Sequence, residues 1–127
     1  MIKKLTKAEE EIMLILWELK ESLVRDIIPR ISDPETPYTT VSTVIRILEN
    51  KGFVSHKAFG NTHLYFPIVS KREYSRAQLT DFVGSYFNGS FSTMATFFAR
   101  ETDMSMEELQ QMLDEMQKER KQKAANE

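Results

Sequence analysis

The chain has 127 residues, which is enough for one domain, or for a small domain with an appended helical segment, but not for two full cores. Hydrophobic residues make up 41% of it and charged residues 28%, so the composition excludes intrinsic disorder. No apolar run approaches the roughly 18 residues that span a bilayer, and the first residues lack a signal peptide's apolar stretch, so we expect a soluble cytoplasmic protein. The absence of cysteine excludes disulfides, thiolate metal sites and cysteine nucleophiles.

The formal net charge of −2 argues at first against a nucleic-acid partner, but the charges are unevenly distributed along the chain. Residues 36–72 carry five basic side chains and one acidic side chain, a net charge of +4. Residues 77–127 carry five basic and nine acidic side chains, a net charge of −4. A basic middle and an acidic C-terminal region indicate two separate tasks, and the basic segment suits a polyanion.

The first predicted helix covers residues 7–20. Thr6 and Glu9 have the spacing of a capping box, in which a hydroxyl and a carboxylate satisfy free amides at a helix start. The apolar residues that follow recur at helical spacing and predict one buried face. This face comprises Ala8, Ile12, Met13, Ile15, Leu16, Trp17 and Leu19.

Two more helices are predicted before Gly52. The first, at about 24–31, should be short, bent or frayed, because Pro29 lacks the amide that a helix interior requires. Two prolines make residues 32–37 a loop. The next helix runs from about Thr39 to Asn50, and Gly52 ends it. Its apolar stripe comprises Val41, Val44, Ile45 and Leu48.

A β-hairpin is predicted next. Residues 53–58 and 62–67 are rich in aromatic and β-branched side chains, and they flank Gly60-Asn61, two residues that tolerate the positive φ of a tight turn. Three short helices followed by a hairpin form the winged helix-turn-helix plan. We therefore predict a mainly α fold with a small β-hairpin, in which residues 1–70 form a winged helix-turn-helix DNA-binding domain.

Residues 71–127 are predicted to form a helical dimerisation region, with helices at about 71–87, 91–101 and 106–121. Capping-box spacings recur at Ser70-x-x-Glu73 and Ser105-x-x-Glu108. Three helices alone cannot bury the apolar side chains of this region, so we expect a partner to cover them. The predicted dimer interface comprises Leu79, Phe82, Val83, Tyr86, Phe87, Phe91, Met94, Phe98, Leu109, Met112, Leu113 and Met116.

The outward face of the third helix suits DNA, because short hydroxyl side chains can approach phosphates and bases closely. These side chains are Thr39, Thr40, Ser42 and Thr43. Arg46 is the residue of this face that can make a bidentate contact with guanine. Four further basic side chains are expected to bind phosphates and to set the salt dependence of binding. They are Lys51, Lys57, Lys71 and Arg72.

Three motifs, in order along the chain, resemble the BlaI/MecI/CopY family of bacterial transcriptional repressors, the penicillinase-repressor group. The motifs are Leu5-Thr6-Lys7-Ala8-Glu9 with Leu16-Trp17, Tyr38-Thr39-Thr40-Val41-Ser42-Thr43-Val44 with Lys51-Gly52, and Tyr65-Phe66-Pro67; the Phe98-Ala99 region fits as well. The resemblance extends from Leu5 to about Met116. It implies a homodimeric repressor of a palindromic operator, with C-terminal helices that interlock between protomers.

The resemblance also implies how repression could end. In the penicillinase branch, a membrane sensor with a metalloprotease domain leads to cleavage between an Asn and a Phe, and the aligned pair here is Phe97-Phe98. The copper-responsive branch carries paired cysteines, which are missing here. The family commonly has Arg at the positions of Ile47 and Asn61. We expect Asn61 to contact DNA, and we expect the operator sequence and the affinity to differ from those of the better-known family members.

Two other functions remain open from the residues alone. A winged-helix module could bind a protein through the same helix face, and the Phe- and Met-rich C-terminal helices could enclose an effector pocket. No enzyme is expected, because HExxH, GxSxG and P-loop motifs are absent, and no cofactor is implied. No metal site is expected either, since His56 and His63 lack a third ligand.

Overall fold

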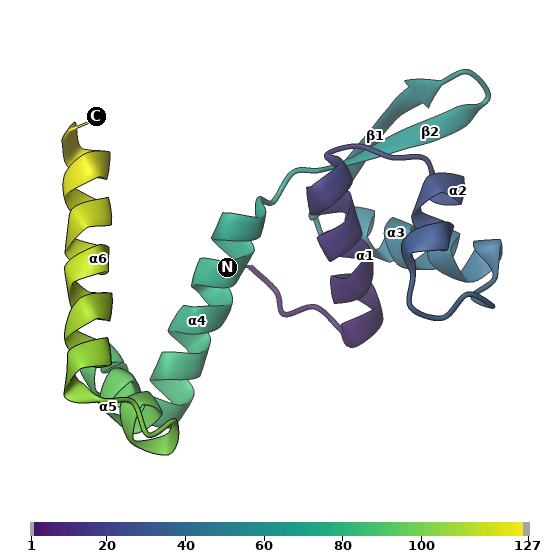
Figure 1. The fold of residues 1–127 in the computed structure, drawn as a ribbon. Helices are drawn as coiled ribbons and strands as arrows, with labels where there is room; N and C mark the ends of the chain where they lie inside the picture. Colours follow the sequence, from purple (N-terminus) through teal and green to yellow (C-terminus); the bar gives the residue numbers. More distant parts are fainter. Residues whose placement is uncertain (1, 126–127) are drawn as a thin grey trace. The chain divides into compact units, whose positions relative to one another are not determined.

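The computed structural model describes residues 2–125, and Figure 1 shows their course. The elements follow in chain order as α1 (Lys7–Leu19), α2 (Val24–Ile27), the 3₁₀ turn η1 (Ile28–Arg30), α3 (Tyr38–Asn50), β1 (Val54–Phe59), β2 (Thr62–Pro67), α4 (Lys71–Phe87), α5 (Phe91–Glu101) and α6 (Met106–Ala125). This helical fold with one two-stranded sheet confirms the predicted fold class. The chain forms two compact units, one ending at Leu79 and the other beginning at Thr80, so α4 contributes to both.

Helix α1 begins at the predicted capping box. The Thr6 hydroxyl accepts a hydrogen bond from the Glu9 amide at 3.2 Å, and the Glu9 carboxylate accepts one from the Thr6 amide at 2.9 Å. Ala8, which the apolar pattern places on the buried face, is exposed, and Glu9 is buried instead. A carboxylate is tolerated there because hydrogen bonds satisfy it. The core of this unit includes Leu5, Ile12, Met13, Ile15, Leu16, Val24, Ile27, Val41, Ile45, Leu48, Phe53, Val54, Tyr65 and Tyr74.

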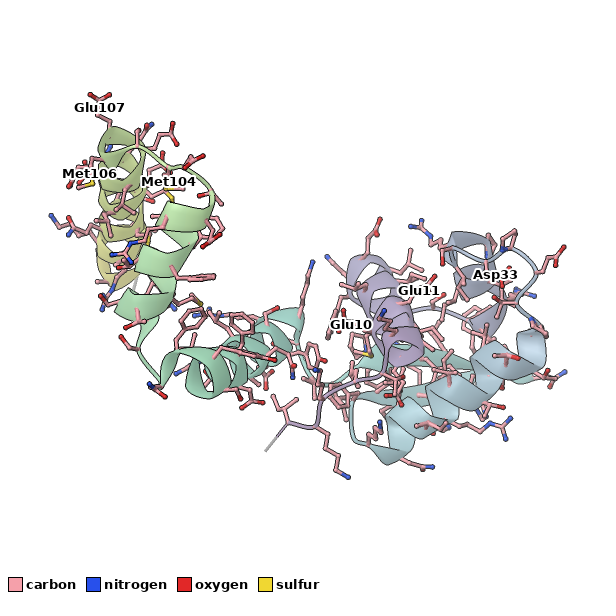
Figure 2. The ribbon with its side chains drawn as sticks, turned by 90° about the horizontal axis from the view of Figure 1, so that it is seen from below. Glu10, Glu11, Asp33, Met104, Met106 and Glu107 are labelled. Carbon is pink, nitrogen blue, oxygen red and sulfur yellow. The ribbon has the colours of Figure 1, made fainter. Side chains whose placement is uncertain are left out.

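The second helix is short and tightens into a 3₁₀ turn at Ile28, which confirms the bend expected at Pro29. The loop after it is held to α1, because the Ser32 amide donates a hydrogen bond to the Glu11 carboxylate at 2.6 Å. Figure 2 shows Glu11 on α1 and Asp33 in this loop. Pro37 then precedes α3, whose Val41, Ile45 and Leu48 are buried.

The hairpin forms with the predicted two-residue turn, since Phe59 lies opposite Thr62 in the antiparallel register. Gly60 has a φ of +60°, whereas Asn61 is not among the described non-glycine residues with positive φ. The turn therefore requires glycine at its first position only, as in a type II′ turn. A bridge between Ser22 and Tyr65, with 2.9 Å hydrogen bonds in both directions, ties the hairpin to the helices.

The three C-terminal helices each begin at a serine cap. The amides of Glu73, Thr93 and Glu108 donate to the hydroxyls of Ser70, Ser90 and Ser105 at 3.0–3.2 Å. Met104 and Met106 lie where α5 turns into α6 (Figure 2). Helix α6 extends to Ala125, beyond the predicted end at residue 121.

Most of the predicted interface residues are exposed or half-buried in the single chain. Val83 is the exception, because it is 7% exposed and already packs within its own unit. The exposed ones are Leu79, Phe82, Tyr86, Phe91, Phe98, Met112, Leu113 and Met116, and the half-buried ones are Phe87, Met94 and Leu109. So many exposed large apolar side chains are unusual on the surface of a monomer.

Candidate nucleic-acid interface

Helix α3 separates its apolar stripe from a polar outward face. Thr39, Thr40, Thr43 and Arg46 are exposed, and Ser42 is half-buried beside them. The helix has 13 residues, and at about 1.5 Å of rise per residue its length suits a major groove. The predicted hydroxyl face is therefore presented to solvent by a helix whose other side is held in the core.

Internal hydrogen bonds order this face without neutralising it. The Thr43 hydroxyl donates to the Thr39 carbonyl at 2.8 Å, which leaves the lone pairs of its oxygen able to accept a hydrogen bond. The Arg46 guanidinium lies 3.5 Å from the Ser42 hydroxyl. Within residues 2–125, Arg46 has no ion pair with a carboxylate, so its charge is available to a polyanion.

A groove of about 310 Å³ connects the outward face of α3 with the hairpin; we call it the helix–wing groove. It brings Ser42 and Arg46 of α3 together with Asn61 at the hairpin turn, three of the predicted DNA-binding residues. Its full lining is Val24, Tyr38, Ser42, Arg46, Asn61, Thr62, His63 and Tyr65. Tyr38 and His63 were not predicted as contacts; their place in the groove depends on the packing of the hairpin against α3.

Lys51 does not line this groove, and its ammonium is engaged within the fold. Its ammonium is 2.8 and 2.9 Å from the two carboxylate oxygens of Glu9, whose side chain is only 7% exposed. Burial raises the pKa of Glu9, but the hydrogen bonds from Lys51 and Thr6 outweigh burial, so the pKa is lowered from 4.5. Because Lys51 is engaged inside the fold, we leave it out of the interface.

The other predicted phosphate contacts differ in their surroundings. Lys57 is exposed on β1 and lies 3.3 Å from Glu21, an exposed pair that contributes little to stability and that a phosphate can replace. Arg72 is exposed in the first turn of α4. Lys71 lines a second groove, of about 680 Å³, between α1 and the start of α4.

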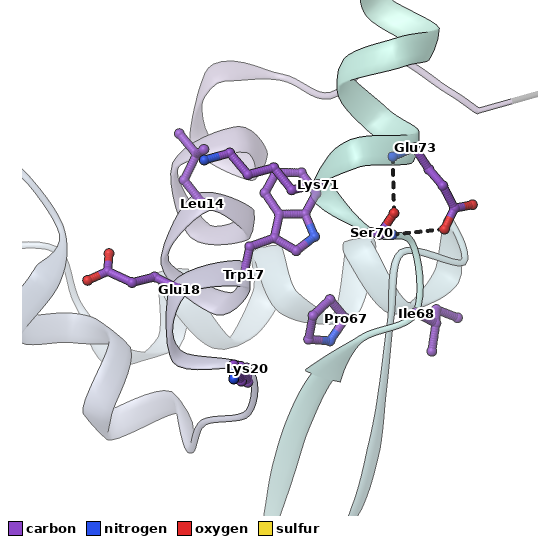
Figure 3. A pocket seen from close by; sticks show the side chains of 9 residues that line it. All are labelled: Leu14, Trp17, Glu18, Lys20, Pro67, Ile68, Ser70, Lys71 and Glu73. Atoms are coloured by element: carbon purple, nitrogen blue, oxygen red, sulfur yellow. Dashed lines mark hydrogen bonds between the residues drawn. The ribbon is translucent and has the colours of Figure 1, made fainter. Parts of the chain in front are cut away.

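Figure 3 shows that second groove, with Lys71 extending beside Trp17 and Leu14. The Trp17 indole donates to the Val69 carbonyl at 2.9 Å, which fixes its ring in the groove wall. The full lining is Leu14, Trp17, Glu18, Lys20, Pro67, Ile68, Ser70, Lys71 and Glu73. The two grooves have no lining residue in common, so Lys71 lies outside the helix–wing groove.

The two histidines lie together on the hairpin. Their rings are stacked, with centroids 4.1 Å apart and planes inclined by 11°. His56 Nδ1 is 2.5 Å from a carboxylate oxygen of Glu49, near the end of α3. Among residues 2–125, no three His, Cys, Asp or Glu side chains are arranged to hold a metal ion. Sequence spacing could not pair the histidines, because the pairing depends on the strand register.

No helix within the described range has the length and apolar character to cross a membrane.

A model of the penicillinase repressor family matches residues 5–118. The chain is 24% identical over 113 residues to the penicillinase repressor of Bacillus licheniformis, covering 87% of this chain and 88% of that protein. It is 24% identical over 110 residues to the methicillin resistance regulatory protein MecI of Staphylococcus aureus strain N315, covering 86% and 89%.

A solved structure has a similar fold to the N-terminal part of the chain. This is the solution structure of the DNA-binding domain of the repressor BlaI, with a TM-score of 0.51 and 24% sequence identity. The match covers 58% of this chain and 92% of that domain. The winged-helix architecture predicted from the order of the elements is thereby confirmed.

Proposed function

This chain belongs to the penicillinase repressor family, and from that premise we propose that it is a transcriptional repressor that binds a palindromic operator as a homodimer. Helix α3 would lie in the major groove, with Thr39, Thr40, Ser42 and Thr43 at base edges and phosphates and Arg46 at a guanine. The β1–β2 wing would follow the adjoining backbone, with Asn61 at its tip.

One observation carries the proposal, namely the helix–wing groove. It joins the outward face of α3 to the hairpin, and its lining contains Arg46 and His63 but no carboxylate. Glu49, the acidic residue of α3, is engaged by His56. A groove with an unpaired guanidinium and no carboxylate in its lining favours phosphate over an acidic protein partner.

The homodimer is supported by the apolar surface of the second unit. Phe82 and Phe91 are each about half exposed, at 47% and 49%, and Tyr86 is 73% exposed. Burial of apolar surface stabilises association by about 25 cal/mol per Å², so pairing with a second copy is favoured over leaving these rings in water. The net negative charge of this region would keep it away from the DNA.

A second candidate is a repressor with an effector pocket. The second unit holds a cavity of about 330 Å³ with an almost entirely apolar lining that includes Phe82, Phe87 and Met94. An apolar small molecule would fit its chemistry. The two candidates differ in a measurement, because an effector would change operator affinity at constant dimer concentration, whereas dimer packing alone would not.

Release by proteolysis is the route that the family implies, under a membrane sensor metalloprotease. Phe97 and Phe98 are 53% and 50% exposed, so their side chains are accessible in the single chain. Both lie within α5, however, and a protease binds its substrate in an extended conformation. We infer that cleavage of the Phe97–Phe98 peptide bond would require α5 to unwind locally.

The proposal is tested by incubating the purified full chain with fragments of its source genome and sequencing those retained. We expect a palindrome with half-sites about one helical turn apart, or a multiple of it. Arg46→Ala should enrich that palindrome less strongly and tolerate other bases at one position of each half-site, and Lys118→Ala on α6 is the charge-matched control that should enrich it as the unmodified protein does. Retention without any common sequence, or equal enrichment by both variants, would contradict the proposal.

A further inference from the structure

We propose that His63 is a phosphate contact of the helix–wing groove and that it acts as an imidazolium, so that affinity for DNA increases as the pH falls from about 8 to about 6. The inference rests on the proposed function, because it concerns the same DNA-binding surface. It adds a contact residue outside α3 and a pH dependence that the hydroxyl and arginine contacts cannot produce.

The position of His63 follows from the hairpin register. His56 lies opposite Tyr65 and Ala58 lies opposite His63, so both imidazoles and the Tyr65 ring are on the same side of the hairpin. This side contributes His63 and Tyr65 to the helix–wing groove, where Arg46 and Ser42 are the α3 residues. His63 is exposed, so its ring can reach an anion that enters the groove.

The groups around the imidazole pair define its charge environment. From α3, Glu49 binds His56, and Arg46 and Tyr38 line the groove. From the hairpin, the Tyr65 ring centroid is 5.5 Å from that of His56 and 6.0 Å from that of His63.

From α2, Val24 contributes only an apolar wall to the groove. Lys57 lies between His56 and Ala58 in β1, so it is on the opposite side of the hairpin from the imidazoles, and it is paired with Glu21. The groove therefore offers His63 a guanidinium and hydroxyl groups but no carboxylate of its own.

The stack couples the two rings to the anion in the groove. Glu49 compensates a positive charge on His56, but two parallel imidazolium rings with centroids 4.1 Å apart would repel each other. A phosphate beside His63 supplies the second negative charge, so both rings can be positive in the complex. Binding of DNA should therefore take up a proton, and by linkage a lower pH should strengthen binding.

The test uses the full chain and the operator duplex recovered by genomic selection, at constant ionic strength and at about pH 6, 7 and 8. Uptake of one proton predicts that affinity rises by up to about tenfold per pH unit. His63→Gln should remove most of this rise, because the amide cannot take up a proton. Calorimetry in two buffers of different ionisation enthalpy should show proton uptake for the unmodified protein and its loss in His63→Gln.

Two control variants separate contact from structure. Lys57→Gln removes a charge from the side of the hairpin opposite the imidazoles. It should weaken DNA binding equally at every pH and reduce the dependence of affinity on salt concentration. His56→Gln breaks the bond to Glu49; if it removes the pH dependence while His63→Gln retains it, the assignment to His63 is wrong. Thermal unfolding of each variant checks that the hairpin remains folded.

The two proposals fail in different ways. If no duplex is retained at any pH, the repressor function is wrong and the role of His63 is wrong with it. If the duplex binds but the affinity of His63→Gln depends on pH as strongly as that of the unmodified protein, only the inference about His63 is overturned.

Discussion

Lys51 and Glu9 form an ion pair that joins the end of α3 to the first turn of α1. The ammonium contacts both carboxylate oxygens, at 2.8 and 2.9 Å, and the Glu9 side chain is almost fully buried. Glu9 also completes the capping box with Thr6. One carboxylate thus sets the start of α1 and connects it to α3, the proposed recognition helix.

Loss of the lysine should leave this carboxylate buried without its partner. We expect Lys51→Met to lower the free energy of unfolding by roughly 2–4 kcal/mol, because an unpaired buried charge is costly. Denaturant unfolding measures the effect. The double variant Glu9→Gln with Lys51→Met should recover part of the loss; a single variant as stable as the original protein would show that the pair is dispensable.

The same pair should make the fold sensitive to acid. The pKa of Glu9 is lowered in the folded chain, so its carboxylate stabilises the fold above the ordinary value of 4.5, and this contribution is lost as the pH falls through the folded pKa. Glu9→Gln should be less stable near neutral pH, yet lose less stability between about pH 5 and about pH 3. Melting temperatures across this range give the comparison, and parallel pH profiles would contradict it.

Arg46 and Lys57 should differ in the kind of binding they support. Arg46→Ala should cost about 1–3 kcal/mol on the selected operator and relax discrimination at one base pair in each half-site, because a bidentate guanine contact is lost. Lys57→Ala should weaken specific and random duplexes alike and reduce the salt slope by about one. Titrations on both duplexes decide the matter, and equal losses for both variants would remove the distinction.

The second unit should control dimerisation. A chain that ends at Leu79 retains Tyr74, which packs in the core of the first unit, and should be a folded monomer with weak operator binding. Sedimentation analysis at micromolar concentration measures the oligomeric state. In the full chain, Leu113→Glu should disrupt the dimer, whereas Gln111→Glu, an exposed polar position of the same helix, should not. A full chain that is itself monomeric would contradict the homodimer.

Helix starts were predictable from the sequence because their signals are local, whereas the C-terminal end of α6 was not. Thr6 with Glu9 and Ser70 with Glu73 make the hydrogen bonds expected of their spacing, and Pro29 marks the change from α2 to the 3₁₀ turn. Each signal acts within three or four residues, so neighbouring side chains in the sequence suffice to identify it.

Side-chain directions between distant elements were not predictable in the same way. A lysine is long and flexible, so nothing near Lys51 or Lys71 in the sequence reveals that one turns inward to Glu9 and the other lies along Trp17. The buried position of Glu9 was missed for the same reason, since the apolar pattern favoured Ala8 and the partner is 42 residues away.

The sequence by itself therefore determined the order of the elements, the hydroxyl face of α3 and the family, because periodicity, capping and short motifs each depend on residues that are close together in the sequence. Only the tertiary structure decided which charges face the groove. Packing of the hairpin against α3 brings His63 beside Arg46 and stacks it on His56, and the strand register that does so is a property of the folded chain.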